Sequence, residues 1–517
     1  MTAIGYEWVR NHCRLDALPP RRSAHIRPVT RVEQFADHVA VPAGVAPGQE
    51  ADVLDHLLFA LKHEHTNLAI LMEGMRHVPA GRVSATFRQT PGGAYARLAG
   101  FFWEQSNRCQ LEDLPAATGA VVDVFDPSRF VTGQDQRNAR WRVNFNGLGT
   151  LVYCATVERT PAIKEAIERS VLDRANHVLS GMDSNIRDRA LEWAYLSETR
   201  GSFEIEGEVP GASKQAAFVR VLQQAHLREP LTEDYLSELQ NIAITNPLQR
   251  AASFRQEQNH LARADRGAAA VTYVPPPPVL AHELMDALMD WSNNHLEGVD
   301  PLVAASVVSF GFVFIHPYMD GNGRLSRFLL HQTLCRAGAL ENGLILPVSV
   351  AMKKHEAEYL DALQQFSRPM RAKWDVRWID AEQFEYTYLG DAQYGAYRYW
   401  DATSAAEFCM KMAELALDDE LRNETEFLMR YDMAHNEVDK AYDLINTDLA
   451  VLLVSAFQQG GVVSKRRRDQ FQHRVPEAAF DFIESTVKAV LATESINFDA
   501  RPQADNEGLN QQESGNG

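Results

Sequence analysis

The stretch HPYMDGNGRLSR, residues 316–327, decides the fold in the middle of this chain. An apolar run, Leu302 to Ile315, leads into it, and the proline at position 317 disfavours helical backbone at His316. The residues from 323 onward, GRLSRFLLHQTL, have the composition of a helix. The stretch therefore predicts a helix that ends at His316, a short loop that contains glycine, and a second helix directly after it.

The loop between these two predicted helices suits an anion. Gly321 and Gly323 leave their backbone N–H groups unhindered, and the N-terminus of the following helix favours negative charge. Arg324 and Arg327 lie three residues apart, so both guanidinium groups share one face of the first helical turn. Cations at that end of a helix oppose its dipole, a cost that an anionic ligand offsets. The pattern predicts a phosphate site.

Two more side chains add chemistry to this site. Asp320 stands just before the glycines, where a carboxylate can hold the Mg²⁺ that accompanies nucleotide phosphates. His316 can take a proton from an attacking hydroxyl group, since a histidine has an ordinary pKa of about 6.5. An EF-hand calcium loop is excluded, because it needs glycine where Leu325 stands and glutamate where His331 stands. We expect a nucleotide-handling site with a general base.

The stretch resembles the signature of Fic-domain proteins, H-P-[FY]-x-[DE]-G-N-G-R-x-x-R, and matches it at every specified position. The resemblance covers roughly residues 190 to 370. It implies transfer of AMP from ATP to a Ser, Thr or Tyr hydroxyl of a target protein, with release of pyrophosphate. It also implies that His316 is the general base, that Asp320 binds Mg²⁺, and that the phosphates lie against Gly321, Asn322, Gly323, Arg324 and Arg327.

The resemblance leaves other activities open. Relatives that act as kinases have lysine at the position of Gly323, so the glycine favours nucleotidyl transfer. Some relatives use UTP or CDP-choline, and some remove AMP from modified targets. A non-catalytic module that binds nucleotide or a phosphorylated partner as a switch is the alternative of another class. The intact His316 and Asp320 argue against that switch, because binding alone needs no general base.

A second stretch, SFEIEG at residues 202–207, indicates regulation. It fits the family's inhibitory pattern [ST]-x-x-x-E-[GN], whose glutamate pairs with the second arginine of the signature and blocks the γ-phosphate position. Ser202 and Glu206 are four residues apart, so on one helix they share a face. A carboxylate on Arg327 competes with phosphate for one bidentate site. The resemblance thus implies the family's class with an upstream inhibitory helix, here near residues 195–207.

A β-prone run, Val271 to Val274, precedes four prolines and a predicted helix. By resemblance this run is the family's flap, near residues 271–275, which holds the target peptide as an added strand through main-chain hydrogen bonds. The flap residues predicted to face the target are Thr272, Tyr273 and Val274.

Helical periodicity dominates the rest of the chain, and strands are predicted to be scarce. The expected fold class is mainly α. We predict an N-terminal, mostly helical domain of unknown role at residues 1–158, a Fic domain at 159–375, a C-terminal helical extension at 376–500 and a disordered tail at 501–517.

Composition narrows the partners. Acidic residues outnumber basic ones by 69 to 51, and the net charge of -18 argues against general nucleic-acid binding. The short basic run Lys465 to Arg468 is interpreted as a solvated face. No apolar segment predicts a membrane span, and five scattered cysteines with no signal peptide favour the cytoplasm. A homodimer is a hypothesis taken from relatives.

Overall fold

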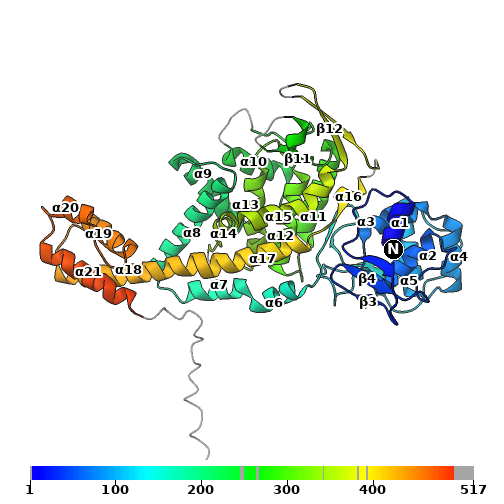
Figure 1. The fold of residues 1–517 in the computed structure, drawn as a ribbon, viewed down its shortest axis with the longest axis horizontal. Coiled ribbons are helices and arrows are strands. Elements are labelled where there is room, and N and C mark those ends of the chain that lie inside the picture. Colours follow the sequence, from blue (N-terminus) through cyan, green and yellow to red (C-terminus); the bar gives the residue numbers. More distant parts are fainter. Residues whose placement is uncertain are drawn as a thin grey trace, which may run out of the picture. The chain divides into compact units, whose positions relative to one another are not determined.

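The computed structural model describes residues 3–244, 250–263, 267–341, 343–380, 383–391 and 394–493. Helices predominate among them and the strands are short, so the predicted mainly α fold is confirmed (Figure 1). The chain forms two compact units, of which the first holds Met1–Arg169 with Tyr195–Ala416 and the second holds Ser170–Ala194 with Leu417–Gly517. The four-part domain division stays a prediction, and the predicted tail at 501–517 lies outside the described residues.

The N-terminal part of the first unit combines helices with small sheets. Its helices are α1 (Gly5–His12), α2 (Val53–His63), α3 (Leu68–Gly74), α4 (Ala80–Gln89), α5 (Ala94–Asn107) and α6 (Pro161–Arg169). Its strands are β1 (Ala3–Ile4), β2 (Ser23–Ile26), β3 (Glu33–Gln34), β4 (His38–Val41), β5 (Val122–Asp123), β6 (Gln136–Asn138), β7 (Val143–Phe145), β8 (Leu148–Gly149) and β9 (Cys154–Thr156). The first four strands form one sheet in the order β1-β2-β4-β3, and the next three form another in the order β5-β7-β6.

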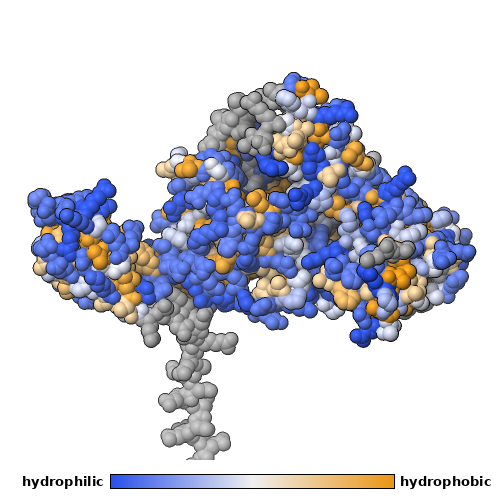
Figure 2. Space-filling model, in the orientation of Figure 1, coloured by the Kyte–Doolittle hydropathy of each residue, from blue (hydrophilic) through white to orange (hydrophobic). Residues whose placement is uncertain are grey.

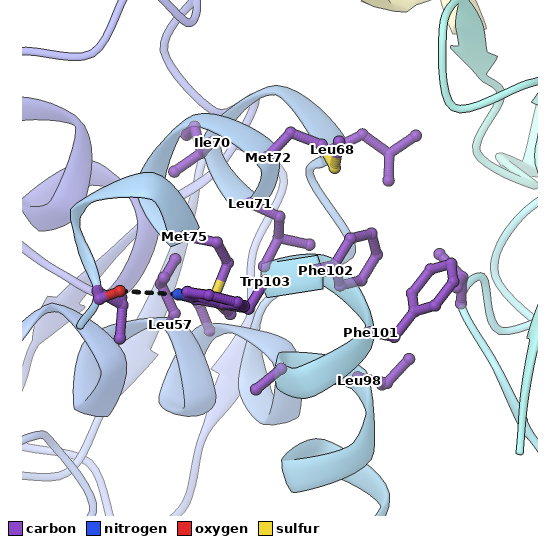
Figure 3. Close-up of a cluster of buried hydrophobic side chains, with 14 of the residues drawn as sticks. Leu57, Leu68, Ile70, Leu71, Met72, Met75, Leu98, Phe101, Phe102 and Trp103 are labelled. Atoms are coloured by element: carbon purple, nitrogen blue, oxygen red, sulfur yellow. Dashed lines mark hydrogen bonds between the residues drawn. The ribbon is translucent and has the colours of Figure 1, made fainter. Parts of the chain in front are cut away.

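A hydrophobic cluster holds these helices together. Side chains from α2, α3 and α5 meet in it, and Figure 3 shows Leu57, Leu71, Phe102 and Trp103 within it. The indole Nε1–H of Trp103 donates to the backbone oxygen of Val78 at 2.8 Å, so the one polar atom of this ring is satisfied inside the core.

The remainder of the first unit is built around two buried helices, α12 (Pro301–Ile315) and α13 (Asn322–Arg336), which pack against each other. Helices α11 (Pro278–Asn294) and α17 (Thr403–Leu415) pack on α12, and α10 (Glu233–Ala243) packs on α13. The other helices here are α8 (Ser184–Ile205), whose C-terminal half belongs to this unit, α9 (Ala212–Gln223), α14 (Val348–Lys354), α15 (Glu356–Arg371) and α16 (Gly395–Arg398). The central pair carries the 316–327 stretch at its connection.

Short strands occur more widely than the sequence indicated. Strands β10 (Leu261–Ala262) and β11 (Val271–Tyr273) pair antiparallel, as do β12 (Trp374–Trp378) and β13 (Phe384–Tyr388). Strand β14 (Tyr399–Asp401) joins β9 in parallel, so residues almost 250 positions apart share one sheet with β8. Pairing over such a distance leaves no local periodicity, which is why the sequence did not reveal it.

The second unit is a helical bundle with its own core. It holds α7 (Val171–Ser180), the start of α8, α18 (Arg422–Ala441), α19 (Asn446–Gln458), α20 (Lys465–Phe471) and α21 (Glu477–Leu491), and a π-helical turn, Ala416–Leu421, lies at its boundary. Leu453, Phe480 and Ile483 are fully buried in its cluster. In the basic run, Arg468 pairs with Glu477, Asp481 and Glu484, so this part of the run is a paired surface.

The face drawn in Figure 2 is mostly hydrophilic, with hydrophobic residues in small separate groups. No helix in the described ranges is long and apolar enough to cross a membrane. All five cysteines have free thiols.

Candidate functional site

Helix α12 delivers His316 to the site. Asp300 caps the helix by accepting hydrogen bonds from the N–H groups of Leu302 and Val303, both at 3.0 Å, and Pro301 takes the first helical position. The helix ends at Ile315, as predicted, and His316 follows with left-handed backbone, φ 53° and ψ 60°. The imidazole therefore stands at the end of a rigid, almost wholly buried element.

The surroundings of His316 keep its ring neutral. Its Nδ1 lies 3.2 Å from the backbone oxygen of Val313; a carbonyl only accepts, so Nδ1 carries the proton and Nε2 keeps a free lone pair. The pKa of His316 is lowered to about 4, chiefly by burial and also by the charge of Arg255, while the Val313 hydrogen bond opposes this. At neutral pH the ring is thus a base with Nε2 available.

Arg255 is a site residue that sequence reasoning missed. Its Nε donates to the backbone oxygen of His316 at 2.9 Å, its own N–H donates to that of Pro317 at 2.7 Å, and its guanidinium also binds the backbone oxygen of Pro276. It is 4% exposed, and burial lowers its pKa to about 10. Arg255 thus links the segment after β11 to the loop after α12. The only signal in the sequence was its place within the stretch that resembles the family.

The loop between α12 and α13 is held by its own residues. Asn322 accepts from the N–H of Tyr318 at 3.0 Å and donates to its backbone oxygen at 2.8 Å, and Gly321 adopts left-handed backbone at φ 83°. Asn322 is 2% exposed, so in this structure its side chain shapes the loop. The Asp320 carboxylate is 37% exposed, accepts from the N–H of Gly321 at 2.6 Å and lies 3.7 Å from Arg324.

The end of α8 meets the first turn of α13. Arg327 donates from Nε to Ser202 Oγ at 2.7 Å and from one terminal nitrogen to Glu206 Oε1 at 2.8 Å and to the Ser202 backbone oxygen at 2.8 Å. The other Glu206 oxygen, Oε2, lies 2.7 Å from Arg324 Nε. The structure thus brings Ser202, Glu206 and Arg327 together, and the single glutamate bridges both arginines, whereas the sequence had indicated a pairing with Arg327 alone.

Gly323 lies directly against this bridging carboxylate. A Cβ at position 323 would stand 2.6 Å from Glu206 Oε1, closer than such contacts occur. The glycine therefore leaves room for the Glu206 carboxylate beside the start of α13, where it contacts the two arginines that the sequence predicted for phosphate.

Glu208 also lies next to Arg324, and sequence reasoning missed this acid. Its Oε1 lies 3.4 Å from Arg324, and its Oε2 accepts from Lys214 at 2.5 Å. Burial by itself would raise the pKa of Glu208. The hydrogen bond from Lys214 and the charges of Arg324 and Lys214 together outweigh burial, so the pKa is lowered. Arg324 is 2% exposed, and with Asp320, Glu206 and Glu208 around it three carboxylates share this guanidinium.

The predicted flap is a two-stranded hairpin, β10 with β11. Of the three residues predicted to face a target, Thr272 is exposed, whereas Tyr273 and Val274 are buried, and Tyr273 donates from its hydroxyl to the backbone oxygen of Phe314 at 2.6 Å. Arg371 holds the hairpin from α15 by donating to the backbone oxygens of Val271 at 3.0 Å and Ala268 at 3.3 Å. Of these three residues, Thr272 alone presents its side chain to solvent.

The residues present fit one magnesium ion only in combination with phosphate oxygens. Among the described residues no group of three or more His, Cys, Asp or Glu side chains forms a metal cage. Mg²⁺ at nucleotide sites is usually held by one or two carboxylates together with substrate phosphates, which suits the half-exposed Asp320.

Residues 230–334 match the Fic/DOC family. Protein adenylyltransferase Fic of Aedes aegypti is 36% identical over 93 residues, which are 18% of this chain and 17% of that protein. The same-named protein of Drosophila virilis is 24% identical over 227 residues, 43% of this chain and 42% of that protein, and a probable protein adenylyltransferase of Aquifex aeolicus is 33% identical over 93 residues, 18% and 26%. The matches thus span less than half the length of these relatives.

Solved structures that resemble the chain include a Fic-domain-containing signalling protein from Bacteroides thetaiotaomicron, with 18% identity and a TM-score of 0.36 over 52% of this chain and 97% of that one. Fic-1 from Caenorhabditis elegans has 19% identity and a TM-score of 0.33 over 51% and 74%. The family match covers the segment that holds the 316–327 stretch. This chain carries a Fic domain of the Fic/DOC family, located at residues 230–334.

Proposed function

We propose that the chain is a protein adenylyltransferase, which transfers AMP from ATP to a Ser, Thr or Tyr hydroxyl of a target protein and is autoinhibited by Glu206. One arrangement carries the proposal. A buried, neutral His316 stands at the end of α12, and one loop later two buried arginines pair with the carboxylate of Glu206. We propose that the phosphates of ATP bind where this carboxylate now lies. Names of relatives as protein adenylyltransferases support the reaction class.

The chemistry follows from these groups. His316 Nε2 accepts the proton of the target hydroxyl while the hydroxyl oxygen forms a bond to the α-phosphorus of ATP. The bond between that phosphorus and the oxygen bridging to the β-phosphorus breaks, and pyrophosphate leaves with the electron pair. Arg324, Arg327 and the N–H groups at the start of α13 neutralise the phosphate charge, which is the main demand of such transfers. When bound at Asp320, Mg²⁺ supplies further charge neutralisation to the phosphates.

Autoinhibition follows from competition for the arginines. As long as Glu206 bridges Arg324 and Arg327, a nucleotide phosphate meets a carboxylate where it needs two cations. We propose that the resting protein is weakly active for this reason. A cytoplasmic site of action and a homodimer remain parts of the proposal, and size-exclusion chromatography with light scattering tests the second.

The test is incorporation of α-labelled ATP into protein, with Mg²⁺ and cell lysate as the source of targets. We expect weak labelling by the wild type, labelling at least about tenfold stronger by Glu206→Gly, and none by His316→Ala. The matched control is Glu204→Gly, which removes an exposed carboxylate from the last turn of α8, two residues before Glu206, and introduces the same flexible residue. We expect this control to behave like the wild type.

Two outcomes would remove the proposal. If Glu206→Gly binds ATP and labels neither itself nor any lysate protein, adenylylation fails in that lysate. If Glu204→Gly labels as strongly as Glu206→Gly, the gain reflects a loosened helix end and not the carboxylate on the arginines.

A further inference from the structure

Helix α8 has a second polar anchor, deeper in the molecule than Glu206. Glu198 and His331 are both 0% exposed, and His331 Nε2 lies 3.0 Å from Glu198 Oε1. Since a carboxylate only accepts, the histidine donates here. Glu198 Oε1 also accepts from Ser349 Oγ at 2.5 Å, and Oε2 accepts from the Ser349 N–H at 2.8 Å. One buried side chain of α8 thus binds α13 and the first turn of α14.

This anchor is in register with the inhibitory contact. Glu198, Ser202 and Glu206 are spaced by four residues; Glu198 and Ser202 lie on α8, about 6 Å apart along its axis, and Glu206 directly follows the helix. Their partners on α13 run in the opposite direction with the same spacing: His331 faces Glu198, Arg327 faces Ser202, and Gly323 faces Glu206. A slip of α8 by a single residue, about 1.5 Å, would misalign all three contacts at once.

The backbone of α8 also approaches α14 closely at this point. A Cβ on Gly201 would stand 2.8 Å from both the carbonyl carbon of Ser349 and the nitrogen of Val350. Farther along, the buried ring of Phe203 lies beneath Arg324, with 5.1 Å from the ring centroid to the guanidinium carbon. Glu198 is therefore one end of a fixed segment, and Glu206 extends beyond its other end.

We propose that Glu198 is a positioning residue for the inhibitory contact, which fixes α8 against α13 and α14 so that Ser202 and Glu206 meet the arginines. This inference rests on the proposed function, since it assumes that Glu206 and ATP compete. Without Glu198, α8 is free to shift along α13, Glu206 holds the arginines less well, and the nucleotide binds more tightly.

The test is the dissociation constant of ATP with Mg²⁺, measured by isothermal titration calorimetry on the full chain. A His316→Ala background prevents turnover during the titration. Glu198→Gln keeps the shape of the side chain but replaces one carboxylate oxygen with an NH₂ group. That group cannot accept the hydrogen bonds that His331 and Ser349 donate to Glu198. We expect it to tighten ATP binding about tenfold, the equivalent of one charge-assisted hydrogen bond. In combination with Glu206→Gly we expect no gain over Glu206→Gly alone.

Thr199→Val is the matched control. Thr199 is the next residue on α8, is 0% exposed, and its Oγ1 has no hydrogen-bond partner within the described part of the chain. Its replacement perturbs a buried α8 position without removing an interaction, and we expect unchanged ATP affinity. Ser349→Ala removes one of the bonds to Glu198 and should tighten binding about threefold, which keeps the inference testable if Glu198→Gln does not fold.

A Glu198→Gln variant with a lowered melting temperature and wild-type ATP affinity would overturn the inference, because the residue would then serve stability alone. A gain in the Glu206→Gly background would do so too, since Glu198 would then act on ATP by another route. Failure of the proposed autoinhibition looks different: Glu206→Gly itself would bind ATP no more tightly than the wild type.

Discussion

An imidazole can accept a proton only while its ring is neutral, and burial sets the pH at which His316 loses that form. The sequence identified the histidine and its place at a helix end. The shift of its pKa could not be predicted, because it depends on the packing of α12 and on the distant Arg255. The same holds for Glu208, which reaches Arg324 only because the chain turns after α8. The sequence thus shows which groups are ionisable, but their pKa values depend on neighbours that only the folded chain brings together.

The lowered pKa of His316 predicts an unusual pH profile. Because the free protein holds this pKa at about 4, the neutral base persists from pH 8 down to about pH 5, and protonation removes it only near pH 4. For Glu206→Gly we expect kcat/KM for AMP transfer to show no break near pH 6.5, the ordinary value for histidine. Rates at each pH, checked against the circular dichroism of the same samples, measure this. An apparent pKa near 6.5 in the profile would contradict it.

Helices were easier to predict than their partners. The helix–loop–helix around 316–327 followed from an apolar run, a proline and two glycines, and α12 and α13 lie where these residues indicated. The Ser202–Glu206 spacing likewise indicated one helical face, and both side chains reach Arg327. The hairpin of β12 and β13 was missed, because its residues fall in a segment interpreted as helical and the strands are defined by their mutual pairing.

The hairpin of β10 and β11 depends on an arginine from outside it. Arg371 on α15 donates to the backbone oxygens of Val271 and Ala268. Arg371→Lys keeps the charge but loses the planar fork that reaches both oxygens. If the hairpin positions the target, KM for a protein target should rise about three- to tenfold while ATP affinity stays unchanged.

The measurement for Arg371→Lys is steady-state labelling of one identified target in the Glu206→Gly background, with ATP affinity from calorimetry alongside. Arg368→Lys makes the same substitution at an exposed position one turn earlier on the same helix, and we expect it to change neither quantity. Equal losses in ATP affinity and target KM would show that Arg371 supports the whole site and not the hairpin in particular.

At the scale of the first unit, a buried acid near the N-terminus, Asp16, pairs with two residues that follow α15. The side chain of Asp16, which follows α1, is 1% exposed and lies 2.8 Å from Lys373 Nζ, while Tyr388 donates from its hydroxyl to the other carboxylate oxygen at 2.5 Å. The sequence could not reveal this contact, since nearly 360 residues separate the partners. This pairing predicts that the N-terminal part folds together with the rest of the first unit and not as an independent module.

Lys373→Met tests that link. It leaves the Asp16 carboxylate buried beside a single hydroxyl, and loss of one partner of a buried pair typically costs about 3 kcal/mol. Calorimetric unfolding should therefore show a lowered transition for the first unit, and the transition of the second unit, with its separate core, should not move. Asp16→Asn combined with Lys373→Met removes the unpaired charge and should recover most of the loss.

The matched control is Lys440→Met, because Lys440 is 71% exposed and its pair with Glu437 lies on the surface of the second unit. Exposed pairs are worth less than about 1 kcal/mol, so neither transition should change noticeably. If Lys373→Met shifts no transition, water replaces the ammonium group at Asp16 and the two parts are joined by apolar packing and the β9–β14 pairing instead. If both transitions fall together, the chain unfolds as one cooperative body, and the two compact units are not independently stable.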